Sequence, residues 1–243
     1  MLYILWKKAR IQLTCLFIIF LTLTHTSSAQ ELNLEDHDNK PFYFGISLGL
    51  NLARFHTDLH PRFLQYDTVL VAEPGNAGGF ALGLSGTARI SNRFELRFNP
   101  QLMFTERHLT YKLTYPDMDA GGTNVTKKIE SVLLTFPLQL KFNSDRIGNF
   151  RVYMFGGIKG DVDLASNARA RKAEELVKIS KYDYGFEAGL GFNFYFPSFI
   201  FSPEVKISNG LNNLHSRDES LKYSNVLDRI LSRMIVFTIH LEG

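Results

Sequence analysis

Cysteine and tryptophan are almost absent from this chain of 243 residues. The single cysteine is Cys15 and the single tryptophan is Trp6, so both lie near the amino terminus. One cysteine forms no disulfide within a chain and builds no cysteine-rich zinc site. Beyond the N-terminal segment, the sequence also lacks an apolar run of the roughly 20 residues that a membrane-spanning helix needs. These absences exclude a disulfide-stapled scaffold and, beyond the N-terminal segment, a membrane-spanning helix.

The N-terminal segment has the pattern of an export signal. Lys7, Lys8 and Arg10 precede an apolar stretch at 11–24, and the small residues Ser27-Ser28-Ala29 follow it. A basic start, a short apolar stretch and a small-residue site are typical of a cleavable signal peptide. We therefore expect cleavage near Ala29-Gln30; the alternative is an uncleaved membrane anchor.

The positive net charge belongs to this segment. The signal holds three of the 27 basic residues and none of the 24 acidic ones, so the remaining chain is neutral by count. A basic isoelectric point that arises from a signal peptide gives no reason to expect a nucleic-acid partner.

Large apolar residues occupy every second position in long runs of the remaining chain. In one of them Phe94, Leu96 and Phe98 alternate with polar or charged residues. A period of two is typical of a β-strand. A continuous apolar face opposite a charged and glycine-rich face is typical of a membrane barrel, where the first face meets lipid and the second lines the lumen. We predict strands at 42–55, 79–90, 94–113, 125–142, 150–162, 182–196, 198–209 and 229–242.

The connections between these strands alternate in length. Short turns are expected at 91–93, 143–149 and 197, between longer segments at 56–78, 114–124, 163–181 and 210–228. Outer-membrane barrels have short periplasmic turns and long external loops. The sequence thus predicts an all-β protein, an eight-stranded antiparallel transmembrane β-barrel with an N-terminal signal peptide, located in the outer membrane. The expected parts are a signal peptide (1–29), a periplasmic N-terminal segment (30–41) and the barrel (42–243).

Two features depart from the strand pattern. Helix-like spacing at 167–179 and 218–231 predicts short helices in the external loops. Pro100, Pro137 and Pro203 lie inside predicted strands, and since proline cannot donate a ladder hydrogen bond, we expect β-bulges there.

Charged residues fall repeatedly on the inward face. The interior of an eight-stranded barrel is just filled by side chains, and an unpaired buried charge is costly, so we expect a paired network. The alternative is an ion path or a proton relay. The predicted lumen network consists of Arg89, Glu95, Arg97, Lys141, Arg151, Lys159, Asp161, Asp183, Glu187, Glu204, Lys206 and Glu242.

Outward phenylalanines gather at the strand ends beside the short turns. Aromatic girdles mark the membrane interfaces of such barrels. The predicted periplasmic girdle consists of Phe94, Phe142, Phe150, Phe196 and Phe199.

Recognisable catalytic motifs are missing. The sequence has no Gly-x-Ser-x-Gly elbow, His-Glu-x-x-His helix or phosphate-binding loop, and we predict no catalytic, cofactor-binding or metal-binding residues and no small-molecule substrate. A rim hydrolase remains an alternative. Its residues would come from His56, Asp58, His60, Asp67, His108, His215 and Asp218, which are otherwise solvated loop groups.

Several strand motifs resemble one known family. They are the stretches 43–49 (YFGISLG), 134–142 (LTFPLQLKF), 183–191 (DYGFEAGLG), 202–206 (SPEVK) and the C-terminal 223–230 (YSNVLDRI). Together they resemble the PorT family of small outer-membrane barrels of Bacteroidetes. The resemblance implies a non-enzymatic barrel that supports type IX protein secretion, and gliding where it occurs, with outer-membrane lipid and other secretion proteins as partners. The alternative is a generic small barrel for adhesion or envelope integrity.

Overall fold

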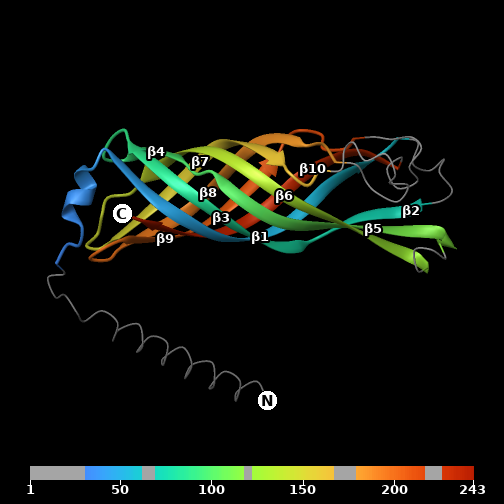
Figure 1. Ribbon diagram of the computed structural model, residues 1–243, viewed down its shortest axis with the longest axis horizontal. Helices are drawn as coiled ribbons and strands as arrows, with labels where there is room; N and C mark the ends of the chain where they lie inside the picture. Colours follow the sequence, from blue (N-terminus) through green and yellow to red (C-terminus); the bar gives the residue numbers. More distant parts are fainter. Residues whose placement is uncertain (1–30, 62–68, 118–121, 167–178, 217–225) are drawn as a thin grey trace, which may run out of the picture. The chain divides into compact units, whose positions relative to one another are not determined.

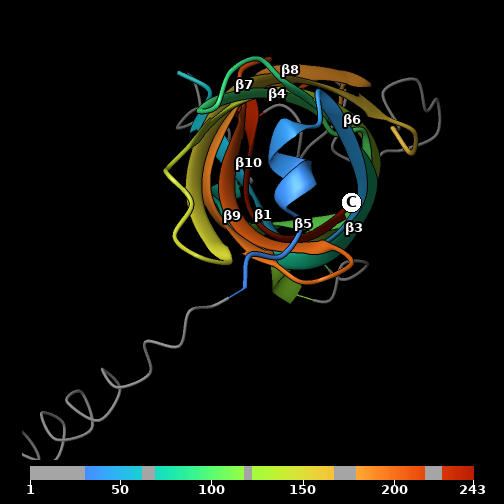
Figure 2. The same cartoon turned by 90° about the vertical axis from the view of Figure 1, so that its left-hand side faces the viewer.

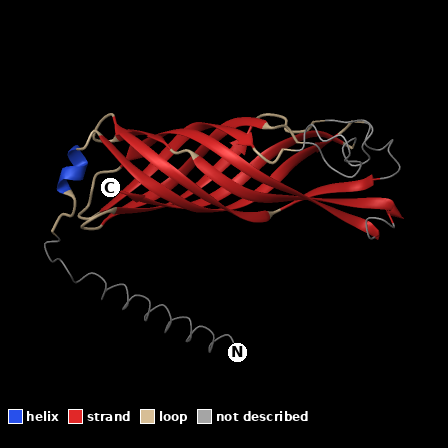
Figure 3. Cartoon of the chain, in the orientation of Figure 1, coloured by secondary structure: helices blue, strands red, loops and turns tan. Residues whose placement is uncertain are grey.

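The computed structural model describes residues 31–61, 69–117, 122–166, 179–216 and 226–243. The chain divides into two units, Met1–Leu32 and Asn33–Gly243, and every strand belongs to the second (Figures 1 and 3). Its elements are η1 (Glu35–Asn39), β1 (Phe42–Leu59), β2 (Val69–Gly75), β3 (Ala77–Arg89), β4 (Phe94–Phe98), β5 (Gln101–Asp117), β6 (Gly122–Asn143), β7 (Phe150–Asp163), β8 (Tyr182–Tyr195), β9 (Ile200–Gly210) and β10 (Leu227–Glu242).

The sheet closes on itself through antiparallel pairing. β1 pairs with β10 on one side and with β3 on the other, which closes the ring seen in Figure 2. We call each of the eight strand positions around the barrel a stave. β4 and β5 follow each other along one stave, between β3 and β6. β2 and β3 follow each other along the next, because β2 also pairs with β5. The predicted eight-stranded antiparallel barrel is therefore confirmed. Closure satisfies the backbone groups that an open sheet edge would leave unpaired in lipid.

The alternation of the sequence becomes an inside-out distribution of polarity. On β1, Leu48 and Leu50 are 47% and 67% exposed, whereas their inward neighbours Ser47 and Asn51 are each 2% exposed. The same contrast runs along the other staves: outer faces carry Phe, Leu, Ile and Val, and buried inner faces carry most of the charges. A soluble barrel would show the opposite arrangement.

The two ends of the barrel differ. The turn end carries the three short connections and the ends of β1 and β10, at Phe42 and Glu242. At the opposite, loop end, β2, β5 and β6 extend beyond the other strands (Figure 1). Apolar side chains close the inside of this end. They form the loop-end apolar cluster: Phe55, Val69, Ala72, Leu109, Tyr111, Leu113, Val125, Ile179, Leu214, Val226, Leu227 and Ile230.

The expected bulges at prolines are wrong. The pairing of β6 with β7 keeps one register through Pro137, and that of β10 with β9 keeps one register through Pro203. At Pro100 the strand is interrupted between β4 and β5, yet the register with β6 is the same on both sides. Asn99 N–H donates to the Pro137 carbonyl (3.3 Å), and the Pro100 carbonyl accepts from Leu84 N–H (3.0 Å). Remaining backbone groups thus hold the register, and no extra residue is inserted.

The helix expected at 218–231 is also wrong where the structure describes it. Leu227–Leu231 is the beginning of β10, paired with the end of β1. Its helix-like spacing reflects Leu227 and Ile230, which join the loop-end apolar cluster. The other expected helix, 167–179, lies outside the described residues except for Ile179, which forms an isolated bridge to His215. Among the described residues, no helix is both long and apolar enough to cross a membrane.

Candidate functional site

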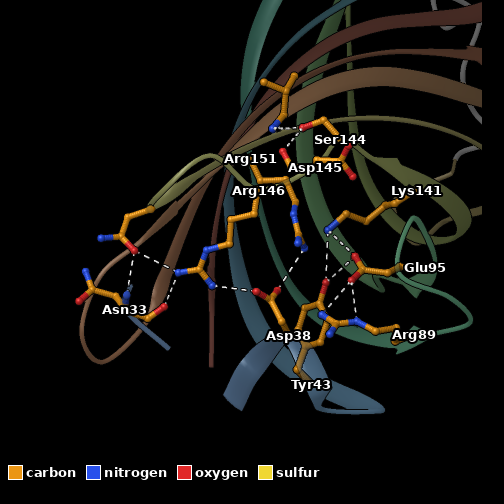
Figure 4. Close-up of polar contacts among 12 residues, drawn as sticks. Asn33, Asp38, Tyr43, Arg89, Glu95, Lys141, Ser144, Asp145, Arg146 and Arg151 are labelled. Atoms are coloured by element: carbon orange, nitrogen blue, oxygen red, sulfur yellow. Dashed lines mark hydrogen bonds and ion pairs between the residues drawn. The ribbon is translucent and has the colours of Figure 1, made fainter. Parts of the chain in front are cut away.

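The barrel interior at the turn end is organised around the Glu95 carboxylate. Arg89 Nη2 lies 3.2 Å from Glu95 Oε1, and Lys141 Nζ lies 3.4 Å from Glu95 Oε2. The Tyr43 hydroxyl donates to Glu95 Oε2 (2.8 Å), as Figure 4 shows. The register produces this cluster, since Glu95 stands opposite Arg89 on β3 and Lys141 on β6.

A second cluster lies deeper in the lumen around Arg97 and Glu204, which are both fully buried. Arg97 Nη2 lies 2.5 Å from Glu204 Oε2, which also accepts from the Tyr153 hydroxyl (3.0 Å). Arg97 Nε donates to Gln139 Oε1 (2.5 Å), and Gln139 donates in turn to Glu187. Arg97 and Gln139 are cross-strand partners on β4 and β6. The contacts of Glu204 with Arg97 and Tyr153, and that of Gln139 with Glu187, join strands that are not neighbours, so they cross-brace the barrel.

Four more of the predicted charges form two pairs within the same interior. Lys206 Nζ lies 3.1 Å from Glu187 Oε2, and Lys159 Nζ lies 2.6 Å from Asp161 Oδ2. All four side chains are buried. Since charge-assisted contacts offset the cost of burying ions only when the partners are close, this geometry is that of a bracing network.

The remaining predicted lumen residues behave differently. Arg151 Nη1 lies 3.3 Å from Asp38 of the N-terminal segment, outside the main clusters. Asp183 accepts from the backbone N–H of Asn212 (3.3 Å). Glu242 is 2% exposed, and among the described residues neither of its carboxylate oxygens has a hydrogen-bond partner.

Sequence reasoning missed Arg107, which is buried between the clusters and the loop end. Its guanidinium donates to the Ser131 hydroxyl (2.5 Å) and lies 4.5 Å from the centre of the Phe55 ring. Side chains along β5 alternate between the lumen and the outer face, and Thr105 faces the lumen. Arg107, two residues further on, could therefore have been identified as a lumen residue. The pocket beside it, lined in part by Asp161 and Asp183, holds about 10 Å³, scarcely room for one water molecule.

Two glycines on the inner face of β8 create space inside the barrel for aromatic rings. A Cβ at Gly191 would overlap the Tyr153 ring, and one at Gly189 would overlap the Phe155 ring. The Arg97 guanidinium lies 5.0 Å from the centre of Phe155. The glycine stripe of β8 therefore admits the rings that hold the central ion pair in place.

The N-terminal segment folds over the turn end as a short latch, residues 33–40 (Figure 2). Arg146 Nη1 lies 2.9 Å from Asp38 Oδ2, and Asn33 N–H donates to Asn149 Oδ1 (2.8 Å) (Figure 4). The contacts of this latch were not predictable from local sequence, because its partners lie in a turn more than 100 residues away.

His37 is the buried residue of the latch. Its ring lies 4.5 Å from the Tyr43 ring, between centroids, and is 2% exposed. Burial, reinforced by the Arg89 guanidinium, lowers the pKa of His37 to about 4. At neutral pH the latch therefore docks with an uncharged imidazole.

The five predicted girdle phenylalanines all lie on the outer face near the turn end. Phe94 and Phe142 are cross-strand partners with ring centroids 5.2 Å apart. Phe196 and Phe199 stack at 5.0 Å across their turn, and Phe150 lies 5.2 Å from Phe194. That this belt meets the periplasmic membrane interface stays a prediction.

The rim residues of the alternative hydrolase do not converge among the described residues. His56 and Asp58 lie on β1, with 3.9 Å between Nε2 and Oδ1, and both are exposed. His108 lies on β5 and contacts Glu106 at 2.5 Å, while His215 is 9% exposed beside Ile179. Asp67 and Asp218 lie outside the described residues. Within the described part of the chain, no group of three or more His, Cys, Asp or Glu side chains could hold a metal ion.

Several known proteins are similar to this chain. Solved structures similar to this chain include OprG from Pseudomonas aeruginosa (13% identity, covering 82% of this chain and 94% of that one, TM-score 0.43). Neisserial surface protein A (12%, 83% and 96%, 0.39) and Ail of Yersinia pestis (12%, 84% and 100%, 0.40) are others. No curated protein matched the sequence. The family described as "Outer membrane protein beta-barrel domain" matches residues 28–216, so the chain belongs to this family and is an outer-membrane β-barrel protein.

Proposed function

We propose that this protein is a closed, non-enzymatic anchor in the outer membrane that acts through the surfaces at its two ends. The packed lumen is the observation that carries the proposal. Its charged side chains are braced in pairs, the latch lies over the turn end, and the apolar cluster fills the loop end. A conducting pore would need a continuous water-filled path, which a filled eight-stranded interior does not provide.

Conductance measurements test the closed state directly. The purified protein, reconstituted in planar bilayers, is expected to show no steady ion current. The matched variant lacks the latch, by deletion of residues 33–40, and is expected to stay closed because the Arg97–Glu204 cluster still fills the barrel. Steady single-channel currents in the intact protein would contradict the proposal.

The finer role that we propose is support of type IX protein secretion. The resemblance of the strand motifs at 43–49, 134–142 and 183–191 to PorT proteins supports it. In this role the barrel holds the latch side in the periplasm, where secretion proteins can contact it, and the loops outside. Deleting the gene should leave type IX cargo in the periplasm, and the plasmid-borne gene should restore export. Normal cargo export in the deletion strain would refute this role.

Adhesion or envelope integrity is the second candidate, favoured by the loop-end extension. β2, β5 and β6 rise beyond the other strands, and their outer face is polar, with His108, Lys112 and Lys128. Such a sheet can present a binding surface away from the membrane. If this candidate holds, shortening the β5–β6 hairpin by removing 114–123, which keeps the loop-end apolar cluster, should abolish surface attachment while cargo export is unchanged.

A further inference from the structure

Two arginines stand directly opposite each other on the outer face of the barrel. Arg54 on β1 pairs in register with Arg233 on β10, and both are exposed. Among the described residues, neither guanidinium has an ion pair or hydrogen bond. Directly opposed like charges destabilise an antiparallel pair. This arginine pair therefore lacks an anion that would compensate it.

The arginine pair lies just above the apolar band. On β1 the outward row is apolar from Phe42 to Leu52, and Arg54 is the next outward residue. That row spans about 33 Å along the strand, or about 25 Å along the barrel axis at a tilt near 40°, which matches the apolar band of a membrane barrel. The arginines consequently lie at the depth of the lipid headgroups.

An open groove adjoins the arginine pair on the same outer face. Leu52, two residues before Arg54, stands opposite Gly78 on β3. Gly78 lines a groove of about 260 Å³, together with Phe80, Phe104 and Val132. The two phenylalanine rings stack with centroids 4.7 Å apart. A Cβ at Gly78 would meet only one backbone oxygen, at 4.0 Å, so the missing side chain leaves free space facing the lipid.

Acidic residues limit which side of the groove can receive an anion. Glu106 and Glu130 line its far rim and are cross-strand partners. A negatively charged headgroup is repelled there and attracted toward Arg54 and Arg233. The other outward side chains of the groove, Phe80, Phe104 and Val132, are apolar, which suits an acyl chain, whereas the two glutamates disfavour an acidic peptide.

We propose that Arg54, Arg233 and the Gly78 groove form a binding site for a phosphate-bearing lipid of the outer leaflet. The phosphate lies between the two guanidinium groups, which are well suited to phosphate oxygens, and an acyl chain fills the groove beside Phe80 and Phe104. The site requires the loop end to face outward, and it is independent of any role in secretion.

Binding of bisphosphorylated lipid A to the purified full-length barrel tests the site. The protein is kept in a zwitterionic detergent, and bound lipid is counted by native mass spectrometry. Replacing both arginines, by Arg54→Gln with Arg233→Gln, should weaken binding about 30-fold, from the usual contribution of a basic side chain near an anionic surface. The charge-preserving pair Arg54→Lys with Arg233→Lys should retain most of the binding. The matched control removes two exposed cations elsewhere, by Arg93→Gln with Lys181→Gln, and should bind normally.

The groove is tested by Gly78→Val, which should lower lipid occupancy several-fold because its side chain takes the place of the acyl chain. Gly156→Val is its control: Gly156 is also outward and exposed, and a Cβ there meets only one backbone oxygen, also at 4.0 Å. Heat-modifiable gel migration verifies that each variant is folded.

Three results would overturn the proposal. The first is unchanged binding in the double glutamine variant. The second is a lipid occupancy in Gly78→Val that is no lower than the occupancy in Gly156→Val. The third is displacement of the lipid by millimolar inorganic phosphate, or equal binding of the dephosphorylated lipid, since either would show that the site does not recognise a phosphorylated lipid as a whole.

Discussion

Breaking the central ion pair should destabilise the barrel far more than breaking an exposed one. Arg97→Met leaves Glu204 buried without its closest cation. Removing one partner of a buried pair generally costs about 3–5 kcal/mol of unfolding free energy. Here the Tyr153 hydroxyl at 3.0 Å and His240 Nε2 at 3.6 Å remain beside the carboxylate, so we expect the lower end, about 3 kcal/mol.

The turn end offers a matched control. Arg93 and Asp145 make a contact of similar length, 3.0 Å, but their side chains are 56% and 80% exposed. Exposed pairs contribute about 0–1 kcal/mol, so Arg93→Met should cost less than about 1 kcal/mol. The double change Arg97→Met with Glu204→Leu should recover much of the loss, because it buries no unpaired charge.

Equilibrium unfolding in urea, with the barrel refolded into lipid vesicles and followed by tyrosine fluorescence and gel migration, measures all four proteins. Equal losses of stability in Arg97→Met and Arg93→Met would refute a special contribution of the buried pair. A double variant less stable than Arg97→Met alone would refute it too, because the ion pair would then not be the source of the effect.

The remaining predictions concern the outer face, the glycine stripe and the latch. Leu190→Arg places a charge on the lipid face near mid-bilayer and should cost about 2–4 kcal/mol in the same unfolding assay; a loss below 1 kcal/mol would show that this face does not meet lipid. Gly191→Ala should cost about 1–3 kcal/mol by displacing the Tyr153 ring, and an intact Tyr153–Glu204 contact in the variant would contradict this. Because the docked His37 has a pKa of about 4 against 6.5 when free, the free latch takes up a proton that the docked latch does not as pH falls below 6.5. Docking should weaken by up to about tenfold per pH unit down to pH 4, seen as lower amide protection factors at 33–40, with the exchange rates corrected for the pH dependence of intrinsic exchange. His37→Gln should abolish the dependence between pH 6.5 and 5, and persistence of the same dependence would assign it to another group.

The period of two sufficed to predict the staves because it reports a physical necessity. Each residue of a barrel strand faces either lipid or lumen, so the apolar Phe94 and the charged Glu95 can be assigned to opposite faces from the sequence alone. Strand ends were less predictable. At the loop end β1 and β10 continue through Leu59 and Leu227, past the membrane band, because apolar contacts in the loop-end cluster hold them there.

Partners within the lumen were predictable only in part. Arg89, Glu95 and Lys141 occupy neighbouring staves at one level, so the strand order almost dictates their contact. Arg97 and Glu204 meet across the barrel, and that contact depends on the shear of the closed sheet, which no local pattern encodes. The latch was missed for a similar reason: its anchor, Arg146, lies in a turn whose position is fixed only when the barrel closes.

The chemistry of the two barrel ends argues against a simple gate. At the turn end the latch is polar, and Asp38 is shared between Arg146 and Arg151, so water can replace these contacts at modest cost. At the loop end the closure is apolar, and exposing side chains such as Leu109 and Ile230 to water would cost about 2–3 kcal/mol for each one. Opening the latch would therefore expose the Glu95 cluster to the solvent without creating a path through the barrel. Any regulation that acts on the latch is thus expected to change which surface is presented at the turn end, and to leave the barrel closed.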